Sequence, residues 1–568
     1  MPRRWLTPAV FLLAALLLTA GLGLLPLTQP DEGRNALVAA EMQASGRWLV
    51  PTLGQVDYLD KPAFYFKLVG LSLALFGATE AAARLPSALA ALTLVGVTWA
   101  FARRFLGTRV AALAALALAS MPLFIGFARL VIFDMLLTLF ICLAILAGTL
   151  AETAQGAARR RWYLAGAAAA GLATLVKGPV GFVVPALVHL LAARWNGQRG
   201  VLRRSLAPAN FVVFLALVLP WFVGVSLHVP DFPYYGIAYE TLARFTTPTF
   251  HRNQPPWFYA MVLGAGALPW SLLVPGGALA AWRMRSALGP VDRLCLVWSI
   301  AVVLFFSLSR SKQPAYVLSA CVPLALLVAR ILDAALSRPR GAAAREVWRV
   351  LLALAALAGL GATAALVLRA NPEMLARLPG PTAQRGELWL PALPGVAGVC
   401  FALLGAALAA RLWRSVPAAI ACLALLLPGL LTVAAPSFEA YADARSSRAM
   451  ARRILELPPA TEIACLRCFP SALPFYLGRP ITLVSDDASE LRSNYVRFSI
   501  ARDAALPPEI VPLGQLQSWL AGRSHPVYLL ASDDDQKTLG AIAAERGVAV
   551  TRLSPSYWAA LLPPAAGS

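Results

Sequence analysis

Hydrophobic and polar positions alternate in long blocks along this chain, with apolar runs separated by short polar turns. A helix needs about 20 apolar residues to cross the hydrocarbon core of a bilayer. The first run, residues 8–27, meets that length and carries no charge. Similar runs follow at residues 85–102, 109–127, 132–150, 162–176, 179–193, 209–228, 257–281, 294–309, 314–331, 348–368, 388–410 and 416–434. The pattern predicts an α-helical polytopic membrane protein with about thirteen transmembrane helices.

Arginines gather in the turns that lie on one side of this layout. These turns are residues 103–109, 159–161, 194–204, 283–293, 338–349 and 411–414. Positive charge in short loops marks the cytoplasmic side of a membrane protein. With an odd number of spans and a cytoplasmic N-terminus, the loop 29–84 and the residues after 435 are predicted on the opposite side. The first run is predicted to be retained, because Leu27, Thr28 and Gln29 do not form a small-residue cleavage site.

Composition agrees with a membrane protein. The 568 residues are 59% hydrophobic and 14% charged, and the mean hydropathy is +0.68. A soluble core of this length does not need so much apolar surface. A net charge of +21 can indicate nucleic acid binding. Here the arginines are accounted for by topology, so we expect a phospholipid bilayer as partner and no nucleic acid.

The loop 29–84 interrupts the apolar pattern with a dense group of charges. Pro30 followed by Asp31 and Glu32 predicts a helix start, because carboxylates in the first turn interact favourably with the helix dipole. The helix that follows carries a shallow apolar stripe of Ala36, Leu37, Ala40 and Met42, which predicts a helix lying in the membrane interface. A second amphipathic or re-entrant segment is expected at residues 62–77. Tyr58, Phe64, Tyr65 and Phe66 add aromatic side chains, which favour headgroup depth.

Beyond residue 435 the chain changes character, and short β-branched runs alternate with helical stretches. Strands are expected at residues 462–464, 481–484, 527–530 and 548–551, and helices at 513–520 and 536–546. We therefore divide the chain into a membrane domain, residues 1–435, and a small α/β domain, residues 436–568, on the non-cytoplasmic side. Cys465 and Cys468 form a C-x-x-C in which a disulfide can form in an oxidising compartment.

The candidate functional residues are the charged and aromatic side chains predicted on the non-cytoplasmic side. They are Asp31, Glu32, Arg34, Tyr58, Asp60, Lys61, Asp134, Arg244, Arg252 and Lys312. Each has a structural alternative: the carboxylates can cap helices, the lysines can snorkel at helix ends, as Lys67 and Lys177 can, and the arginines can bind lipid headgroups. The four histidines are scattered, so no metal site is indicated. A divalent cation held near Asp31 and Asp60, with His251, stays open as an alternative.

Three segments carry a resemblance to a known family: PDEGRNA at residues 30–36, YLDKPAFYF at 58–66 and ARLVIFDML at 128–136. Together with the span layout and the trailing domain, they resemble the bacterial aminoarabinose transferases of lipid A. These enzymes are polyprenyl-phosphate-dependent, protein mannosyltransferase-like glycosyltransferases of the GT-C fold. The resemblance implies 4-amino-4-deoxy-L-arabinose transfer from undecaprenyl phosphate to lipid A phosphates, at the periplasmic face of the bacterial inner membrane. It also implies resistance to polymyxin and other cationic peptides. The sequence itself indicates no required cofactor.

The residues permit such chemistry. Departure of an anionic phosphate needs positive charge, which Lys61, Arg34 and Arg244 can supply, while Tyr58, Asp60, Arg252 and Lys312 are candidates for other substrate contacts. Asp31, Asp134 and Glu32 are the catalytic candidates. Asp31 can act as general base for a hydroxyl acceptor. A lipid A phosphate is already anionic, so Asp31 and Asp134 would then orient the nucleophile or hold the ammonium group of the donor.

Two other functions remain open at this stage. A related polyprenyl-phosphate-sugar transferase that modifies protein or another glycan would share Asp31 and Lys61 but would need the general base. A lipid or polysaccharide transporter is the second. Transporters commonly contain repeated halves with interrupted helices at the midplane, whereas this sequence shows no repeat and its ionisable residues gather at one face.

Overall fold

The computed structural model describes residues 6–243, 254–283, 288–376, 390–503 and 505–564. The chain forms two compact units. Unit 1 comprises Met1–Leu22, Leu85–Pro220 and Ala243–Ala440. Unit 2 comprises Gly23–Arg84, Trp221–Leu242 and Tyr441–Ser568. The loop 29–84 and the C-terminal region therefore belong to one unit, although some 360 residues of chain separate them.

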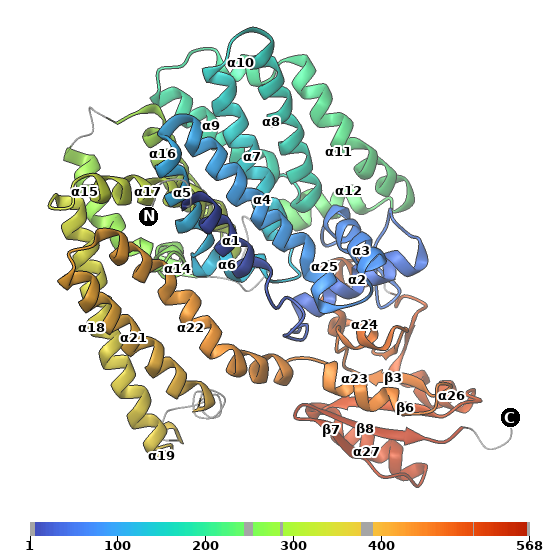
Figure 1. Ribbon diagram of the computed structural model, residues 1–568. Coiled ribbons are helices and arrows are strands. Elements are labelled where there is room, and N and C mark those ends of the chain that lie inside the picture. Colours follow the sequence, from blue (N-terminus) through green and yellow to red (C-terminus); the bar gives the residue numbers. More distant parts are fainter. Residues whose placement is uncertain (1–5, 244–253, 284–287, 377–389, 504, 565–568) are drawn as a thin grey trace. The chain divides into compact units, whose positions relative to one another are not determined.

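Unit 1 is helical (Figure 1). Its helices are α1 (Leu6–Thr19), α4 (Glu80–Leu106), α5 (Thr108–Ala119), α6 (Pro122–Ala128), α7 (Asp134–Thr153), α8 (Gly156–Lys177), α9 (Val180–Trp195), α10 (Val201–Ser205), α11 (Pro208–His228), α14 (Phe258–Gly266), η2 (Trp270–Leu273), α15 (Val274–Arg283), α16 (Pro290–Leu308), η4 (Pro314–Ala320), α17 (Cys321–Ser337), α18 (Ala342–Ala370), α19 (Glu373–Ala376), η5 (Leu390–Ala392), α21 (Leu393–Leu412) and α22 (Val416–Ala444). Helices α4, α11 and α22 continue into unit 2.

Small residues allow these helices to pack closely. Helices α7, α8 and α9 pack against one another, α5 packs on α17, and α18 packs on α21. At Gly181 a Cβ atom would lie 2.3 Å from the carbonyl carbon of Ala173, so only glycine permits this approach of α9 to α8. Such small-residue contacts are how helices associate in lipid, where apolar burial alone provides little driving force.

The predicted spans are all helical. Each overlaps one helix or two consecutive helices, except residues 257–281, which overlap α14, η2 and α15. Among the described residues, eight helices are long and apolar enough to cross a membrane, or ten if two bent pairs count as single spans. The pairs α5–α6 and α14–α15 bend by 67° and 109°. Of the remaining predicted spans, α1 and α9 are shorter, with 14 and 16 residues, and α8 carries three arginines, Arg159 to Arg161, near its start.

The first part of unit 2 contains α2 (Asp31–Ser45), β1 (Thr52–Leu53), β2 (Val56–Asp57) and α3 (Phe64–Phe76), together with α12 (Phe232–Tyr234) and the π-helix η1 (Tyr235–Ala243). Helix α2 begins at Asp31, as predicted, and α3 falls within the segment predicted at residues 62–77, whose placement in the membrane stays a prediction. The predicted interfacial stripe is wrong. Ala36, Leu37 and Met42 are buried, and α2 packs on α3, β1 and the later helix α24.

Two contacts explain why α2 is buried. A Cβ atom at Gly33 would lie 2.8 Å from the Cβ of Ala472, so the glycine lets α2 approach the segment before α24 (Leu473–Leu477). Glu41 accepts hydrogen bonds from Thr52 and from the backbone N–H of Gly54, at 2.6 and 2.9 Å. Burial raises the pKa of Glu41, and these hydrogen bonds oppose the rise. The carboxylate thereby ties the β1–β2 hairpin to α2.

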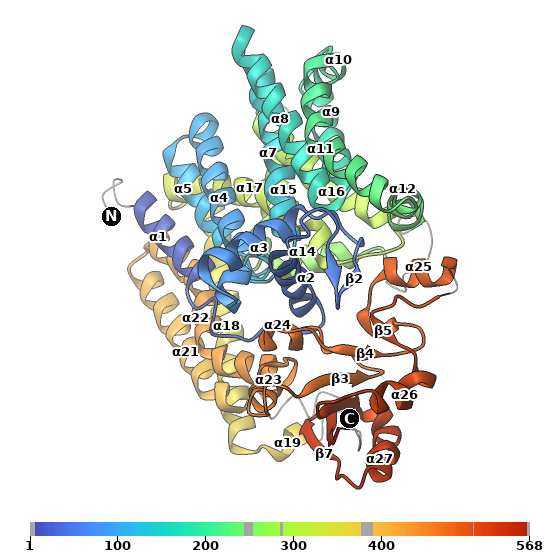
Figure 2. The same cartoon turned by 90° about the vertical axis from the view of Figure 1, so that its right-hand side faces the viewer.

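The C-terminal part of unit 2 is an α/β sheet. Its strands are β3 (Glu462–Leu466), β4 (Thr482–Val484), β5 (Ile510–Val511), β6 (Val527–Ser532), β7 (Thr551–Ser554) and β8 (Tyr557–Leu562), in the order β5-β4-β3-β6-β8-β7. The first four are parallel, and β8 and β7 are antiparallel additions. Figure 2 shows β5, β4 and β3 following one another in this order.

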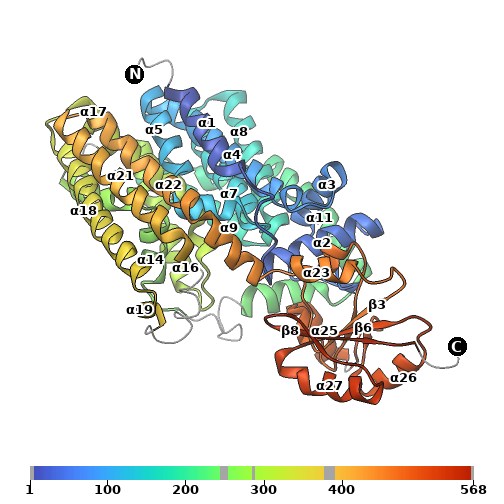
Figure 3. The same cartoon turned by 60° about the horizontal axis from the view of Figure 1, so that its bottom comes forward.

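The helices of this part of unit 2 are α23 (Arg448–Leu455), α24, α25 (Asn494–Asp503), α26 (Leu516–Ala521) and α27 (Gln536–Glu545). Leu516, Leu520, Leu539 and Ile542 of α26 and α27 join the strands in one hydrophobic core, and Figure 3 shows both helices below the sheet. The predicted small α/β region is confirmed, although β5 and β8 were not predicted and β7 shares only Thr551 with the strand predicted at residues 548–551. The predicted domain boundary at residue 435 falls inside α22, and Cys465 and Cys468 are free thiols.

Candidate functional site

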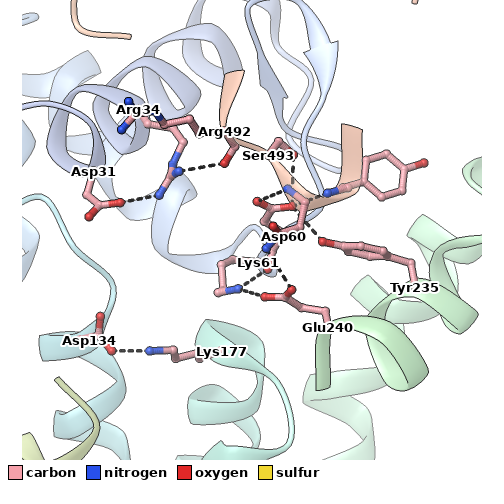
Figure 4. Close-up of polar contacts among 12 residues, drawn as sticks. Asp31, Arg34, Asp60, Lys61, Asp134, Lys177, Tyr235, Glu240, Arg492 and Ser493 are labelled. Carbon is pink, nitrogen blue, oxygen red and sulfur yellow. Dashed lines mark hydrogen bonds and ion pairs between the residues drawn. The ribbon is translucent and has the colours of Figure 1, made fainter. Parts of the chain in front are cut away.

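The first turn of α2 presents one exposed carboxylate and one largely buried guanidinium. Asp31 Oδ1 lies 2.6 Å from Arg34 Nη2, and the side chains are 55% and 16% exposed. Arg34 also donates to the backbone carbonyl of Arg492 at 3.2 Å (Figure 4). Burial lowers the pKa of Arg34, but the nearby Tyr58, Asp31 and Asp60 outweigh burial and raise it above its ordinary value. Arg34 is therefore a fixed cation, and Asp31 is accessible to a ligand.

Glu32, beside Asp31, occupies a different environment. Its two carboxylate oxygens accept from Nε and Nη2 of Arg84 at 2.8 and 2.9 Å, and both side chains are buried. Thr28 donates to the same carboxylate through its backbone N–H and its hydroxyl. Arg84 also donates to the carbonyls of Leu25 and Pro26. The structure thus favours a structural role for Glu32, which fixes the chain before α2, over the catalytic role predicted.

Lys61 forms a buried ion pair with Glu240 of η1 (Figure 4). The two side chains are 10% and 11% exposed. Lys61 Nζ also donates to the carbonyl of Asp60. Snorkelling does not describe this arrangement, because the ammonium group is held inside unit 2 against a carboxylate. Glu240 was not predicted as a site residue.

Asp60 holds the Lys61 loop in place. One carboxylate oxygen accepts from the hydroxyls of Tyr235 and Ser493 and from the backbone N–H of Tyr495, at 2.9, 3.1 and 2.7 Å. The other accepts from the N–H of Asn494 at 3.0 Å. Asp60 therefore joins three distant chain segments, which leaves it poorly suited to bind substrate or a metal ion. Tyr58, the other predicted contact in this loop, is also buried, and burial raises its pKa.

In unit 1, Asp134 and Lys177 form a second buried lysine–carboxylate pair. Lys177 Nζ at the end of α8 lies 2.5 Å from Asp134 Oδ1 at the start of α7, and the side chains are 9% and 7% exposed. The same ammonium group lies 4.9 Å from the ring centre of Phe133 and 4.8 Å from that of Tyr316. The cation–π contacts stabilise the ammonium group. The end of α8 stabilises the same positive charge, and the start of α7 stabilises the carboxylate of Asp134. Lys177 thus joins the site candidates, as a paired cation.

The remaining predicted residues are not brought into these clusters. Lys312, in unit 1, forms no ion pair within the described part of the chain. Arg244, Arg252 and His251 lie outside the described residues. Where the structure describes the chain, no group of three or more His, Cys, Asp or Glu side chains is placed to hold a metal ion.

The fold and these clusters define a class: a polytopic helical membrane protein with buried lysine–carboxylate pairs and an attached α/β sheet. Residues 60–223 match the family described as dolichyl-phosphate-mannose-protein mannosyltransferase. Among curated relatives is an undecaprenyl phosphate-α-4-amino-4-deoxy-L-arabinose arabinosyl transferase of Sodalis glossinidius, 36% identical over 53% of this chain and 54% of the relative. One of Pseudomonas fluorescens Pf0-1 is 32% identical over 65% of each chain. The chain therefore spans between half and two thirds of the curated relatives it matches.

Solved structures extend the similarity to the whole chain. ArnT from Cupriavidus metallidurans bound to undecaprenyl phosphate has a TM-score of 0.83 and 28% identity, covering 99% of this chain and 98% of that one. Its apo state gives a TM-score of 0.80 at 29% identity and 97% coverage of both chains. The chain has the GT-C fold, and the resemblance found in its sequence is confirmed.

Proposed function

We propose that this protein moves 4-amino-4-deoxy-L-arabinose from undecaprenyl phosphate to phosphates of lipid A. The observation that carries the proposal is the match, over almost the whole of both chains, to an ArnT structure bound to undecaprenyl phosphate. The named relatives support the sugar. By the same reasoning the protein resides in the bacterial inner membrane, with its reacting groups at the periplasmic face, where the donor phosphate and the lipid A head group both lie.

The proposed reaction exchanges one phosphate for another at the anomeric carbon of the sugar. A bond forms between an acceptor phosphate oxygen and that carbon, while the bond from the same carbon to the oxygen of undecaprenyl phosphate breaks. The leaving group takes the bonding electrons and departs as a phosphate anion. Because the acceptor oxygen is already anionic at neutral pH, the step requires no proton transfer. Its principal requirement is positive charge at the leaving phosphate.

Residues of unit 2 can supply that charge. Lys61 follows Asp60 in a bend of the chain, Arg34 lies in the first turn of α2, and neither side chain is freely exposed. Phosphate binding would replace Glu240 as the partner of Lys61 with a stronger anion. Asp31, more than half exposed, is the carboxylate best suited to accept the sugar's ammonium group. In unit 1, Asp134 and Lys177 remain candidates for orienting a substrate.

Transfer of this sugar would change the charge of the outer membrane surface. Each modified phosphate loses negative charge and gains an ammonium group. Cationic peptides bind such surfaces largely through electrostatic attraction. The proposal therefore includes resistance to polymyxin and related peptides as the physiological consequence.

Mass spectrometry of lipid A tests the proposal. Cells lacking their own transferase but making the donor would express the protein or its Asp31→Asn variant. We expect aminoarabinose-bearing lipid A only with the unaltered protein. Unmodified lipid A in both strains, with the protein present in the membrane, would refute the assignment.

A second function rests on the match of residues 60–223 to a protein mannosyltransferase family. A sugar transferred to a protein or glycan hydroxyl would require a general base, for which Asp31 is the exposed candidate. Purified protein with the lipid-linked sugar and either lipid A or a hydroxyl acceptor separates the two functions. Product on the hydroxyl acceptor alone would favour this second function.

A further inference from the structure

A cavity of about 900 Å³ lies in unit 2 at the carboxyl ends of two parallel strands. Arg467 and Cys468, which follow β3, and Ser532, which ends β6, line it. Strand β3 pairs with β4 on one side and with β6 on the other, so the winding of the sheet reverses at β3. In open α/β sheets, ligands bind outside the carboxyl ends of the strands at such a switch point. The cavity therefore lies where this fold favours a ligand.

The walls of the cavity are strongly basic. Six arginines line it: Arg34, Arg445, Arg453, Arg467, Arg492 and Arg552. The only acidic side chains in its described lining are Asp443 and Glu490. This excess of fixed positive charge favours an anion that carries more than one negative charge.

Most of these arginines are not neutralised within the protein. Arg445, Arg453, Arg492 and Arg552 form no ion pair with any carboxylate in the described residues. Arg453 and Arg552 instead donate to the backbone carbonyls of Leu553 and Pro555, at 2.9 and 2.7 Å. Arg34 has a buried Nε–H that lacks a hydrogen-bond partner. Unpaired guanidinium groups around one cavity indicate that the missing anion comes from a ligand.

The backbone at two of the arginines supports the same conclusion. Arg467 and Arg492 have φ angles of 47° and 53°. Residues other than glycine rarely adopt this left-handed conformation, and they persist in it where the surrounding structure holds them there, often at ligand-binding positions. Both side chains line the cavity.

We propose that this cavity binds the phosphate-bearing sugar head group of the acceptor lipid. Guanidinium groups match phosphate oxygens with two parallel hydrogen bonds, and Asp443 and Glu490 can accept hydrogen bonds from sugar hydroxyls. The volume lies near the upper end of the range for small-molecule sites, about 300–1,000 Å³, which suits a phosphorylated sugar better than a single phosphate. This inference rests on the proposed function and adds to it the residues that recognise the acceptor.

The positive φ angles allow a clean test. Glycine adopts this backbone conformation without strain, so Arg467→Gly and Arg492→Gly remove the side chains and leave the fold intact. Arg414→Gly is the matched control, because Arg414 also has a φ of 53° but lies in unit 1, outside the cavity. Full-length protein in nanodiscs would be titrated with diphosphoryl lipid A, dephosphorylated lipid A and undecaprenyl phosphate.

We expect the double variant Arg467→Gly/Arg492→Gly to bind diphosphoryl lipid A at least about tenfold more weakly than the unaltered protein. The affinity for undecaprenyl phosphate should change by less than about twofold. Loss of even one hydrogen bond from a charged group to this lipid would change the affinity by more than that. The control should match the unaltered protein, and dephosphorylated lipid A should not distinguish the variants.

Unchanged affinity of the double variant for diphosphoryl lipid A would overturn the proposal. So would displacement of lipid A by inorganic phosphate at a comparable concentration, because the cavity would then be a site for free phosphate. The proposed function fails separately, if cells that express the unaltered protein make no aminoarabinose-bearing lipid A. Modified lipid A in cells together with unaltered binding by the double variant would refute the acceptor site alone.

Discussion

Removal of the Lys61 ammonium group should lower both the free energy of unfolding and the affinity for the donor, and the two losses can be measured separately. Lys61 and Glu240 are each about nine-tenths buried in their ion pair. Removing one partner of a buried pair typically costs about 3–5 kcal/mol. We expect Lys61→Met, which keeps the apolar stem, to lose about 3 kcal/mol, the lower end of that range, because each side chain keeps some contact with water.

Donor binding supplies the second quantity. A charge-assisted hydrogen bond to phosphate is worth about 1.5–3 kcal/mol, or roughly 10- to 100-fold in affinity. Lys61→Met should weaken undecaprenyl phosphate binding by that factor. Glu240→Gln should lower stability as well, but it should leave donor binding equal or tighter, because it removes the carboxylate that competes with phosphate for Lys61.

The double variant Lys61→Met/Glu240→Gln separates the two effects. It removes both charges, so part of the lost stability should return, as in other coupled pairs. Its affinity for undecaprenyl phosphate should remain low. Thermal unfolding and titration of purified protein in nanodiscs measure the two quantities. A double variant that is restored in stability and also binds like the unaltered protein would make Lys61 purely structural and move the donor phosphate towards Arg244 and Arg252.

Four further predictions follow from the site and the topology. Asp31→Asn should keep the thermal midpoint, because Asp31 is exposed, and lose most transfer activity; near-normal activity would return Asp31 to a helix cap. Glu32→Gln should lower stability by about 3 kcal/mol through its buried partner, and an unchanged unfolding midpoint would contradict the structural role. Asp134→Asn should lower transfer activity, and unchanged product formation would remove it from the candidates. Of single cysteines at positions 340 and 546, an impermeant reagent added outside the inner membrane should label only the second; labelling of the first alone would reverse the topology.

The spans could be predicted because lipid imposes one dominant constraint on the sequence. Every backbone polar group at membrane depth must be satisfied within a helix, so apolar length alone locates the elements. The start of α2 could also be predicted, because its signal is local: Pro30, Asp31 and Glu32 are neighbours in sequence. Its burial was not predictable. Ala36 and Met42 fit an interfacial stripe and a packed helix equally well, and the approach at Gly33 depends on Ala472, far along the chain.

The site residues were predicted by type and side of the membrane, but their partners were not. Glu240 lies 179 positions after Lys61, and the groups that hold Asp60 lie as many as 435 positions beyond it. No local period connects such residues, because the pairing is created only when Gly23–Arg84, Trp221–Leu242 and the C-terminal region form unit 2. The partner of Lys177 could not be predicted either. A lysine at the end of a span is typical of snorkelling, whereas the carboxylate that pairs with Lys177 belongs to Asp134, 43 positions earlier.

The two basic regions of unit 2 differ in how their charges are balanced, and the difference suits different ligands. Arg34, paired with Asp31, is one of the arginines that line the cavity, whereas Lys61, outside that lining, is neutralised by Glu240. A donor phosphate that binds there must compete with a carboxylate, and the released carboxylate can then hold the ammonium group of the sugar. Four arginines of the cavity have no such acidic partner in the described chain, so a phosphate binds there without displacing a protein carboxylate. We therefore expect acceptor binding to fall steeply with salt, since unpaired cations are screened most, while donor binding depends on salt less because its site is buried and internally paired.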